Sequence, residues 1–160
     1  MKRLREPVFL DTSVLVAGIV DFGSASRSPV RILDAVAAGG IDRPLTAWHC
    51  CLEFFSVVTR LPEEYRVTPT LARELIETEI LDRFTLPAPA DLPASRRRRW
   101  LRAAVESGVR GGRIYDAAIA ASAMHAKAEL FVTDNVRHFG ALLAEPVRLM
   151  SSEELAKRLG

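Results

Sequence analysis

Four acidic residues stand at positions where an α/β protein commonly carries its chemistry. Asp11 follows the apolar run 8–10, Asp134 follows the run 130–133, and Glu53 and Asp116 lie in segments whose pattern predicts helices. Ligands of open α/β sheets bind outside the carboxyl ends of the strands, so two carboxylates at strand ends can meet in one crevice. Because like charges held so close raise each other's pKa unless a cation neutralises them, these acids indicate a divalent-metal site.

Asp11 begins a polar group of three residues with Thr12 and Ser13, directly after a strand of Val, Phe and Leu. One interpretation is a metal ligand at a polar strand end. The other is a helix N-cap, because Asp, Thr and Ser all cap helices well and a helix could begin near residue 13. The residues alone leave both interpretations open.

Glu53 lies in a strongly apolar segment, 48–61, that is predicted to be a helix. His49, Ser56 and Arg60 fall on the same helical face as Glu53, at spacings of four, three and seven. The carboxylate therefore lies on a narrow polar strip between two apolar ones, which suits a crevice. A solvated Glu53, or one paired with Arg60, is the plainer alternative.

Asp116 falls in the first turn of an alanine-rich predicted helix, where the helix dipole favours an anion. A carboxylate that only stabilises the dipole is the alternative to a ligand. The glycines at 108, 111 and 112 allow the preceding loop to pass close to a ligand. Thr133, Asp134 and Asn135 end the late strand with three polar side chains, although turn formation also explains them. Periodicity does not decide whether Asp134 or Asn135 faces inward.

The elements that must position these residues alternate between strands and helices. We expect strands at 7–10, 43–47, 83–86, 130–133 and 147–150. We expect helices at 29–38, 48–61, 69–81, 94–107, 115–127, 139–143 and after a capping box at 151–154, with a proline-rich loop at 87–93. The helices 48–61 and 69–81 are expected to form a hairpin. This order predicts an α/β fold with a mostly parallel sheet covered on both faces.

Composition narrows the class of protein further. The 160 residues fit a single domain, 1–160, and a hydrophobic content of 49% with 26% charged residues is typical of a globular chain. A net charge of +2 permits nucleic acid as a partner without requiring it. The adjacent Cys50 and Cys51 fit neither a disulfide framework nor spaced zinc ligands. No stretch approaches the roughly 20 apolar residues of a membrane span, so we expect a cytoplasmic protein with no membrane partner.

Four segments resemble, in order and spacing, the successive motifs of a PIN domain. They are VFLDTSVL at 8–15, LEFFSVVTRL at 52–61, IYDAAIAA at 114–121 and FVTDNVRHF at 131–139. The chain is most similar to the VapC-type toxin ribonucleases of bacterial toxin-antitoxin pairs, and the resemblance covers essentially its whole length. Any one motif is weak, whereas four in order are specific.

The resemblance implies a Rossmann-like three-layer α/β/α PIN domain that hydrolyses RNA with Mg²⁺ or Mn²⁺. It implies RNA as substrate, a cognate antitoxin protein as partner and a homodimer. Asp11, Glu53 and Asp116 match the first three acids of the family. The fourth family position falls on Asn135 and leaves Asp134 one residue early. The expected catalytic residues are the four acids, and the expected metal ligands are Asp11, Asp116, Glu53, Asp134 and Asn135.

Hydroxyls and arginines near these acids are candidates for contact with substrate phosphate. Thr12, Ser13 and Thr133 could contact phosphate or support the ligands, with helix capping as the alternative. Arg110 and Arg113 precede Asp116, where phosphate contacts would position RNA without reading its sequence.

Two rival functions remain open from the sequence. A haloacid-dehalogenase-like phosphatase also begins with an apolar strand that ends in Asp, but its chemistry needs a second Asp two residues later, where this chain has Ser13. A non-catalytic PIN-like module that binds RNA or protein is the other, and the residue Asn135 at the fourth position makes it credible.

Overall fold

The computed structural model describes residues 3–87 and 94–160. Within them, four short strands form one parallel sheet in the order β2-β1-β3-β4. Strands β1 and β3 are central, and every residue in them is buried, which explains why their sequences are continuous apolar runs. The strands are β1 Val8–Leu10, β2 Pro44–Leu45, β3 Leu130–Val132 and β4 Arg148–Met150.

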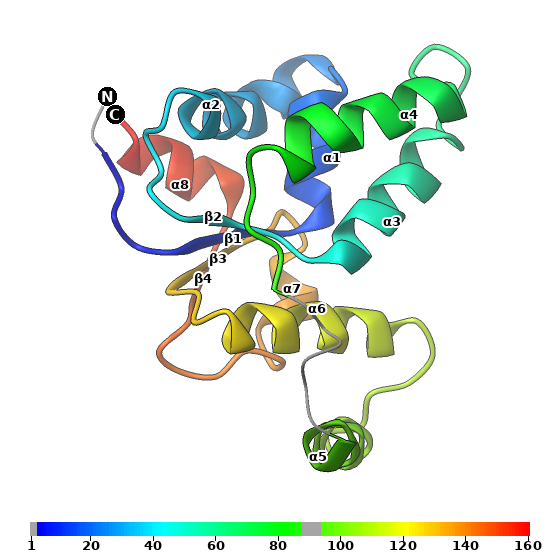
Figure 1. The fold of residues 1–160 in the computed structure, drawn as a ribbon, viewed down its shortest axis with the longest axis vertical. Coiled ribbons are helices and arrows are strands. Elements are labelled where there is room, and N and C mark those ends of the chain that lie inside the picture. The colour runs from blue at the N-terminus through cyan, green and yellow to red at the C-terminus, as the bar shows by residue number, and fades with distance from the viewer. Residues whose placement is uncertain (1–2, 88–93) are drawn as a thin grey trace.

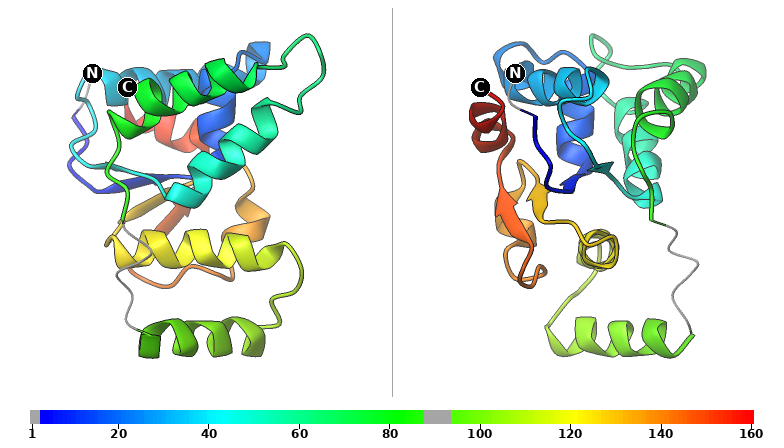
Figure 2. Two further views of the ribbon diagram at one scale, coloured as in Figure 1. Left: turned by 45° about the vertical axis from the view of Figure 1, so that its right-hand side comes forward. Right: turned by 60° about the vertical axis from the view of Figure 1, so that its left-hand side comes forward.

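Helices cover both faces of this sheet (Figure 1). Helices α1, α2 and α8 lie on one side and α6 and α7 on the other, while α3 and α4 form a hairpin, as Figure 2 shows from two further directions. This is the expected three-layer α/β/α arrangement. The helices are α1 Thr12–Ile19, α2 Arg27–Ala37, α3 Trp48–Val58, α4 Pro69–Leu75, α5 Ala94–Glu106, α6 Arg113–His125, α7 Val136–Phe139 and α8 Ser152–Arg158.

The register between β1 and β3 determines where the polar strand ends meet. Phe9 pairs with Phe131, and their rings stack at 5.1 Å between centroids. One step beyond the last pair of this register, Asp11 lies beside Thr133, and the Asp11 amide donates to the Val132 carbonyl at 3.0 Å. The chain leaves β1 toward β2 on one side and leaves β3 toward β4 on the other. The two strand ends therefore flank the switch point of the sheet, where ligands of such folds bind.

Most predicted elements are present with slightly different bounds, and four differ in kind. Helix α1 was not predicted as an element, although its N-cap was one interpretation of Asp11. The segment 83–86 makes only an isolated bridge, between Leu45 and Thr85. The predicted helix 69–81 divides into α4 and a π-helical segment, Ile76–Leu81. The helix expected at 139–143 begins earlier, as α7.

Further expectations concern the ends of the elements and the membrane. The capping box between Ser151 and Glu154 is confirmed at the start of α8. Residues 88–93 of the expected proline-rich loop lie outside the described part of the chain. None of the described helices combines the length and the apolar character that crossing a membrane requires.

Candidate active site

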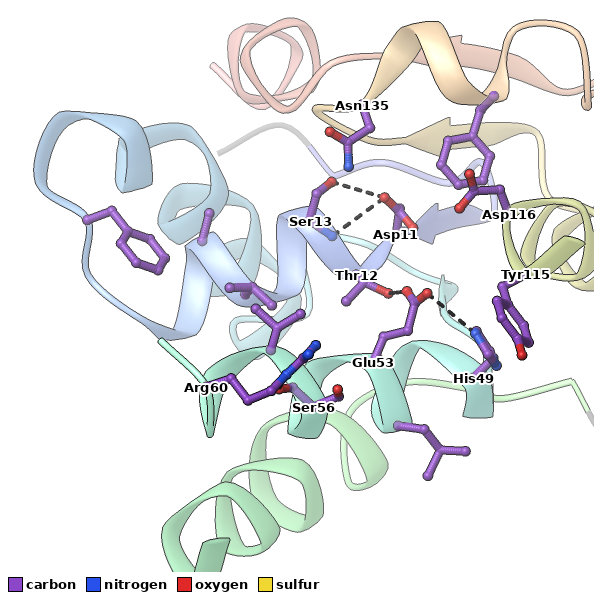
Figure 3. A pocket seen from close by; sticks show the side chains of 16 residues that line it. Asp11, Thr12, Ser13, His49, Glu53, Ser56, Arg60, Tyr115, Asp116 and Asn135 are labelled. Atoms are coloured by element: carbon purple, nitrogen blue, oxygen red, sulfur yellow. Dashed lines mark hydrogen bonds and ion pairs between the residues drawn. The ribbon is translucent and has the colours of Figure 1, made fainter. Parts of the chain in front are cut away.

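A cavity of about 760 Å³ opens at the carboxyl ends of β1 and β3. Asp11 reaches it from the end of β1, Glu53 from α3 and Asp116 from the first turn of α6. Asn135, which follows β3, also lines it. Figure 3 shows these four side chains directed into the same space. Three of the predicted acids thus face one cavity although they lie far apart in the sequence.

Asp11 is 3% exposed and is held by a dense set of hydrogen bonds. Its Oδ2 accepts from the Ser13 amide at 3.5 Å, from Ser13 Oγ at 3.0 Å and from Thr133 Oγ1 at 2.8 Å. Asp11 is also the N-cap of α1, so one residue both caps a helix and lines the cavity. Burial raises the pKa of its carboxyl, and the hydrogen bonds from Thr133 and Ser13 act in the opposite direction.

Backbone amides of the loop after β3 donate hydrogen bonds to the two hydroxyls that hold the Asp11 carboxylate. The Asn135 amide donates to Thr133 Oγ1 at 3.0 Å, and the Asp134 amide donates to Ser13 Oγ at 3.1 Å. Each hydroxyl passes a hydrogen bond on to Asp11, so two short chains of hydrogen bonds converge on one oxygen. Thr133 is fully buried and does not line the cavity. Of the two roles expected for Thr133, contact with phosphate or support of a ligand, this position favours support, because its hydroxyl donates to Asp11.

Glu53 is held from two sides on α3. Thr12 Oγ1 donates to Glu53 Oε2 at 2.6 Å, and His49 Nε2 lies 3.4 Å from Glu53 Oε1. The ion-pair partner of Glu53 is therefore His49, one helical turn earlier, rather than Arg60. Arg60 donates from Nε to the Ser56 carbonyl at 2.8 Å. The polar strip that the helical spacing predicted lines the cavity with His49, Glu53, Ser56 and Arg60.

Asp116 is partly buried, in the first turn of α6. Burial raises the pKa of its carboxyl. His138, whose Nδ1 lies 3.6 Å from Asp116 Oδ2, and Arg113 act against this, whereas the nearby Glu53 charge raises the pKa further. Charges of both signs therefore act on the Asp116 carboxyl.

Asp134 and Asn135 have different surroundings. Asp134 is exposed, its Oδ1 accepts from the Ser152 amide at 3.0 Å, and it does not line the cavity. The chain turns into α7 directly after β3, with Asn135 as its N-cap, and this turn directs Asp134 toward the start of α8. The structure thus departs from the expectation that Asp134 serves as a catalytic metal ligand, and Asn135 takes that place on the cavity wall.

Arg113 lies near Asp116, as expected, and the phosphate contacts of Arg110 and Arg113 stay predictions. Neither Arg110 nor Arg113 lines the cavity, and Arg113 donates from its guanidinium to the His138 carbonyl at 2.8 Å. Arg60 does line the cavity, and the sequence placed it on the polar strip of Glu53 without naming it as a phosphate contact. The spacing of seven residues between Glu53 and Arg60 was the signal that could have identified it.

The donor set of the cavity fits a hard divalent cation. The wall offers three carboxylates and the Asn135 amide, and oxygen donors are what Mg²⁺ and similar ions prefer. Within residues 3–87 and 94–160, no three His, Cys, Asp or Glu side chains lie close enough to hold an ion as they stand. A hard divalent cation keeps several waters and commonly binds through one or two carboxylates, and Asp11 and Asp116 are two of the carboxylates on this wall.

Comparison with known proteins connects this geometry to a family. The family model described as PIN domain matches residues 8–141. Ribonuclease VapC27 of Mycobacterium tuberculosis is 32% identical over 133 residues, covering 82% of this chain and 87% of that protein. Ribonuclease VapC40 of the same species is 32% identical over 124 residues, covering 78% and 84%. The structure of VapBC-1 from nontypeable Haemophilus influenzae is similar in fold, with a TM-score of 0.61 at 16% identity, covering 91% and 98%.

Proposed function

Because this chain belongs to the PIN-domain family, we propose that it is an endoribonuclease that hydrolyses RNA phosphodiester bonds with a divalent cation. The observation that carries the proposal is that Asp11, Glu53 and Asp116 line one cavity while burial raises the pKa of two of them. A cation held between these carboxylates would offset their negative charge as a phosphate enters the cavity. The relatives of 32% identity, named ribonucleases, point to RNA as the substrate.

Asp11 and Asp116 would hold the cation, which we propose to be Mg²⁺ or Mn²⁺, with Glu53 and Asn135 beside them. When bound, the ion would supply Lewis-acid stabilisation of the charge that develops on the phosphate and would lower the pKa of the attacking water. The two hydrogen-bond chains through Ser13 and Thr133 fix Asp11 for this role without any movement of the side chain.

Glu53 would activate the attacking water, and Arg60 would bind the RNA backbone. Glu53, fixed by Thr12 and His49, would orient the water that attacks phosphorus and accept its proton as the bridging P–O bond breaks. Arg60 places a permanent positive charge on the same wall and would bind a phosphate of the RNA backbone. Ser13 Oγ, which is engaged with Asp11, contributes position rather than a nucleophile.

We further propose that a cognate antitoxin protein holds the chain inactive and that the chain forms a homodimer, as the resemblance to VapC-type toxins implies. Exposed apolar side chains, among them Trp48 and Leu52 on α3 and Leu101 and Val105 on α5, would be covered in such assemblies. Light scattering of the purified chain would report its oligomeric state. A monomer at all concentrations would contradict the homodimer.

The test of the proposed function is cleavage of a single-stranded RNA in the presence of Mn²⁺ or Mg²⁺. We expect the wild-type protein to cleave, and we expect EDTA or the substitution Asp11→Asn to abolish cleavage. The variant, purified in the same way, controls for contaminating nucleases. Equal cleavage by both proteins would show that the site does not catalyse the reaction.

The neutral residue Asn135 on the cavity wall favours one alternative function, a module that binds RNA or protein without catalysis. Asn135 lies on the cavity wall where the family pattern allows a fourth acid. Its neutral side chain reduces the negative charge that is available to bind cations. A non-catalytic module that binds RNA or protein would leave the RNA intact with both proteins and still bind it. A filter-binding measurement beside the cleavage assay separates the two functions.

A further inference from the structure

Tyr115 presents an open aromatic ring at the active-site cavity. Its side chain is 54% exposed although it lines the cavity, and it directly precedes Asp116 in the first turn of α6. Large aromatic side chains are normally well buried, because their apolar area dominates the energetics of cores and interfaces. Of the other aromatic residues on this wall, Phe139 is 2% exposed and Phe22 packs against the ring of Tyr65.

The Tyr115 ring is supported from one face. It stacks on the His49 imidazole with 5.0 Å between centroids and an interplanar angle of 12° (Figure 3). His49 is in turn paired with Glu53, which Thr12 holds by a hydrogen bond of 2.6 Å. His49 on α3 thus contacts one face of the Tyr115 ring on α6, and more than half of the Tyr115 side chain remains exposed.

We propose that Tyr115, backed by His49, is a stacking platform for one unpaired RNA base beside the carboxylates. The inference rests on the proposed function and adds the form of the substrate: a single-stranded RNA with a base turned out of its stack. Single-stranded RNA is commonly recognised by bases that stack on aromatic side chains. Every base has a flat π-face, so this platform accepts any of the four bases and carries no sequence information.

The position of the platform gives it a role in catalysis. Tyr115 and Asp116 are adjacent, and His49 and Glu53 are one helical turn apart, so the platform and the carboxylates share the same two helices. A base held on the platform would bring its own backbone to the wall that carries Asp116 and Glu53. A paired base in a duplex has both faces covered by its neighbours and cannot bind in this way.

The experiment compares Tyr115→Ala, Tyr115→Leu and Tyr115→Phe with the wild type. Binding of a fluorescently labelled single-stranded RNA is measured in EDTA by anisotropy, and cleavage is measured with Mn²⁺. Stacking of one base is worth about 1–3 kcal/mol by alanine substitution, so we expect Ala and Leu to raise Kd and KM about 5- to 150-fold while Phe stays near wild type. Tyr65→Ala, which removes a tyrosine whose ring packs at a tilt against Phe22 and is absent from the cavity wall, is the matched control.

An RNA with a single abasic nucleotide, moved along the sequence, completes the test. At one position the abasic substitution should weaken binding to the wild type and have no further effect on Tyr115→Ala. Cleavage by the wild type together with unchanged Kd and KM in Tyr115→Ala would overturn the platform and leave the ribonuclease intact. An equal loss in Tyr115→Phe would overturn it in favour of a hydroxyl contact. Failure of the wild type to bind or cleave RNA would overturn both proposals.

Discussion

Thr133 Oγ1 donates a hydrogen bond of 2.8 Å to Asp11 Oδ2 and so joins residues 122 positions apart at the cavity wall. Thr133 is fully buried, and its hydroxyl also accepts from the Asn135 amide. The same oxygen therefore links the loop after β3 to the carboxylate at the end of β1. A hydroxyl in this position is needed for both partners.

Thr133→Val should remove this link without changing the size of the side chain. We expect the free energy of unfolding to fall by about 1–3 kcal/mol, because the buried Asp11 carboxylate loses a donor and the Asn135 amide loses its acceptor. RNA cleavage should fall as well, because Asp11 is no longer oriented. Urea denaturation and initial cleavage rates measure the two effects. Thr133→Ser keeps the hydroxyl and serves as the control, and an equally large loss there would assign the effect to packing.

Asp116→Asn and Asp134→Asn form a pair that tests which acids act at the site. Asp116 lines the cavity, so its replacement should lower the cleavage rate at least about a hundredfold, as loss of a key electrostatic group commonly does. Asp134 accepts a hydrogen bond from the Ser152 amide, which an Asn side chain can also accept, so that variant should retain its activity. If Asp134→Asn were as inactive as Asp116→Asn, the position of Asp134 in the active protein would differ from the one described.

The sequence allowed the α/β fold and the meeting of Asp11, Glu53 and Asp116 at one cavity to be predicted, because the apolar runs and helical spacings that position them are local patterns. Asp11 follows an apolar strand, and the helical spacing around Glu53 gives the order of the polar strip. The choice between Asp134 and Asn135 could not be made in this way, because it depends on how the chain turns into α7 and on the amide of Ser152, 18 positions further on. The burial of Thr133 likewise depends on pairing between strands distant in sequence.

The pH dependence of stability should reveal the cost of burying Asp11. Burial raises its pKa above the ordinary value of 3.8, so the folded protein binds the proton more tightly than the unfolded chain. The free energy of unfolding therefore falls as pH rises from about 4 through the raised pKa, and this loss persists at neutral pH. In EDTA, Asp11→Asn should become more stable relative to the wild type as the pH rises from about 4 through the raised pKa of Asp11. A difference that stays constant with pH would contradict this prediction.

Addition of a divalent metal ion should offset the stability that the wild type loses by burying the Asp11 carboxylate. An ion that binds only the folded protein stabilises it by about 2.7 kcal/mol at a hundred times its Kd. We expect Mg²⁺ or Mn²⁺ to raise the melting temperature of the wild type at neutral pH and to leave Asp11→Asn nearly unchanged. Thermal melts with and without EDTA measure the effect. The same rise in both proteins would place the ion elsewhere.

Arg60→Ala and Arg113→Ala compare an arginine on the cavity wall with one beside it. Arg60 lines the cavity, whereas the Arg113 guanidinium is engaged with the His138 carbonyl. Loss of one phosphate contact should reduce the salt slope of RNA binding by about 0.7 for a single strand. We expect this change in Arg60→Ala and a smaller one in Arg113→Ala, measured by anisotropy across a salt titration. Equal slopes for Arg60→Ala and the wild type would exclude the contact.

The pairing of β1 with β3 has a consequence for synthesis of the chain. A polypeptide emerging from the ribosome exposes Asp11, Glu53 and Asp116 before residues 130–135, and the hydrogen bond from Thr133 to Asp11 forms only after β3 has followed. Prematurely terminated products that end ahead of β3 carry all three acids and cannot assemble them. Synthesis must therefore pass β3 before the cavity can form, which spares the translating cell from damage by chains that stop earlier.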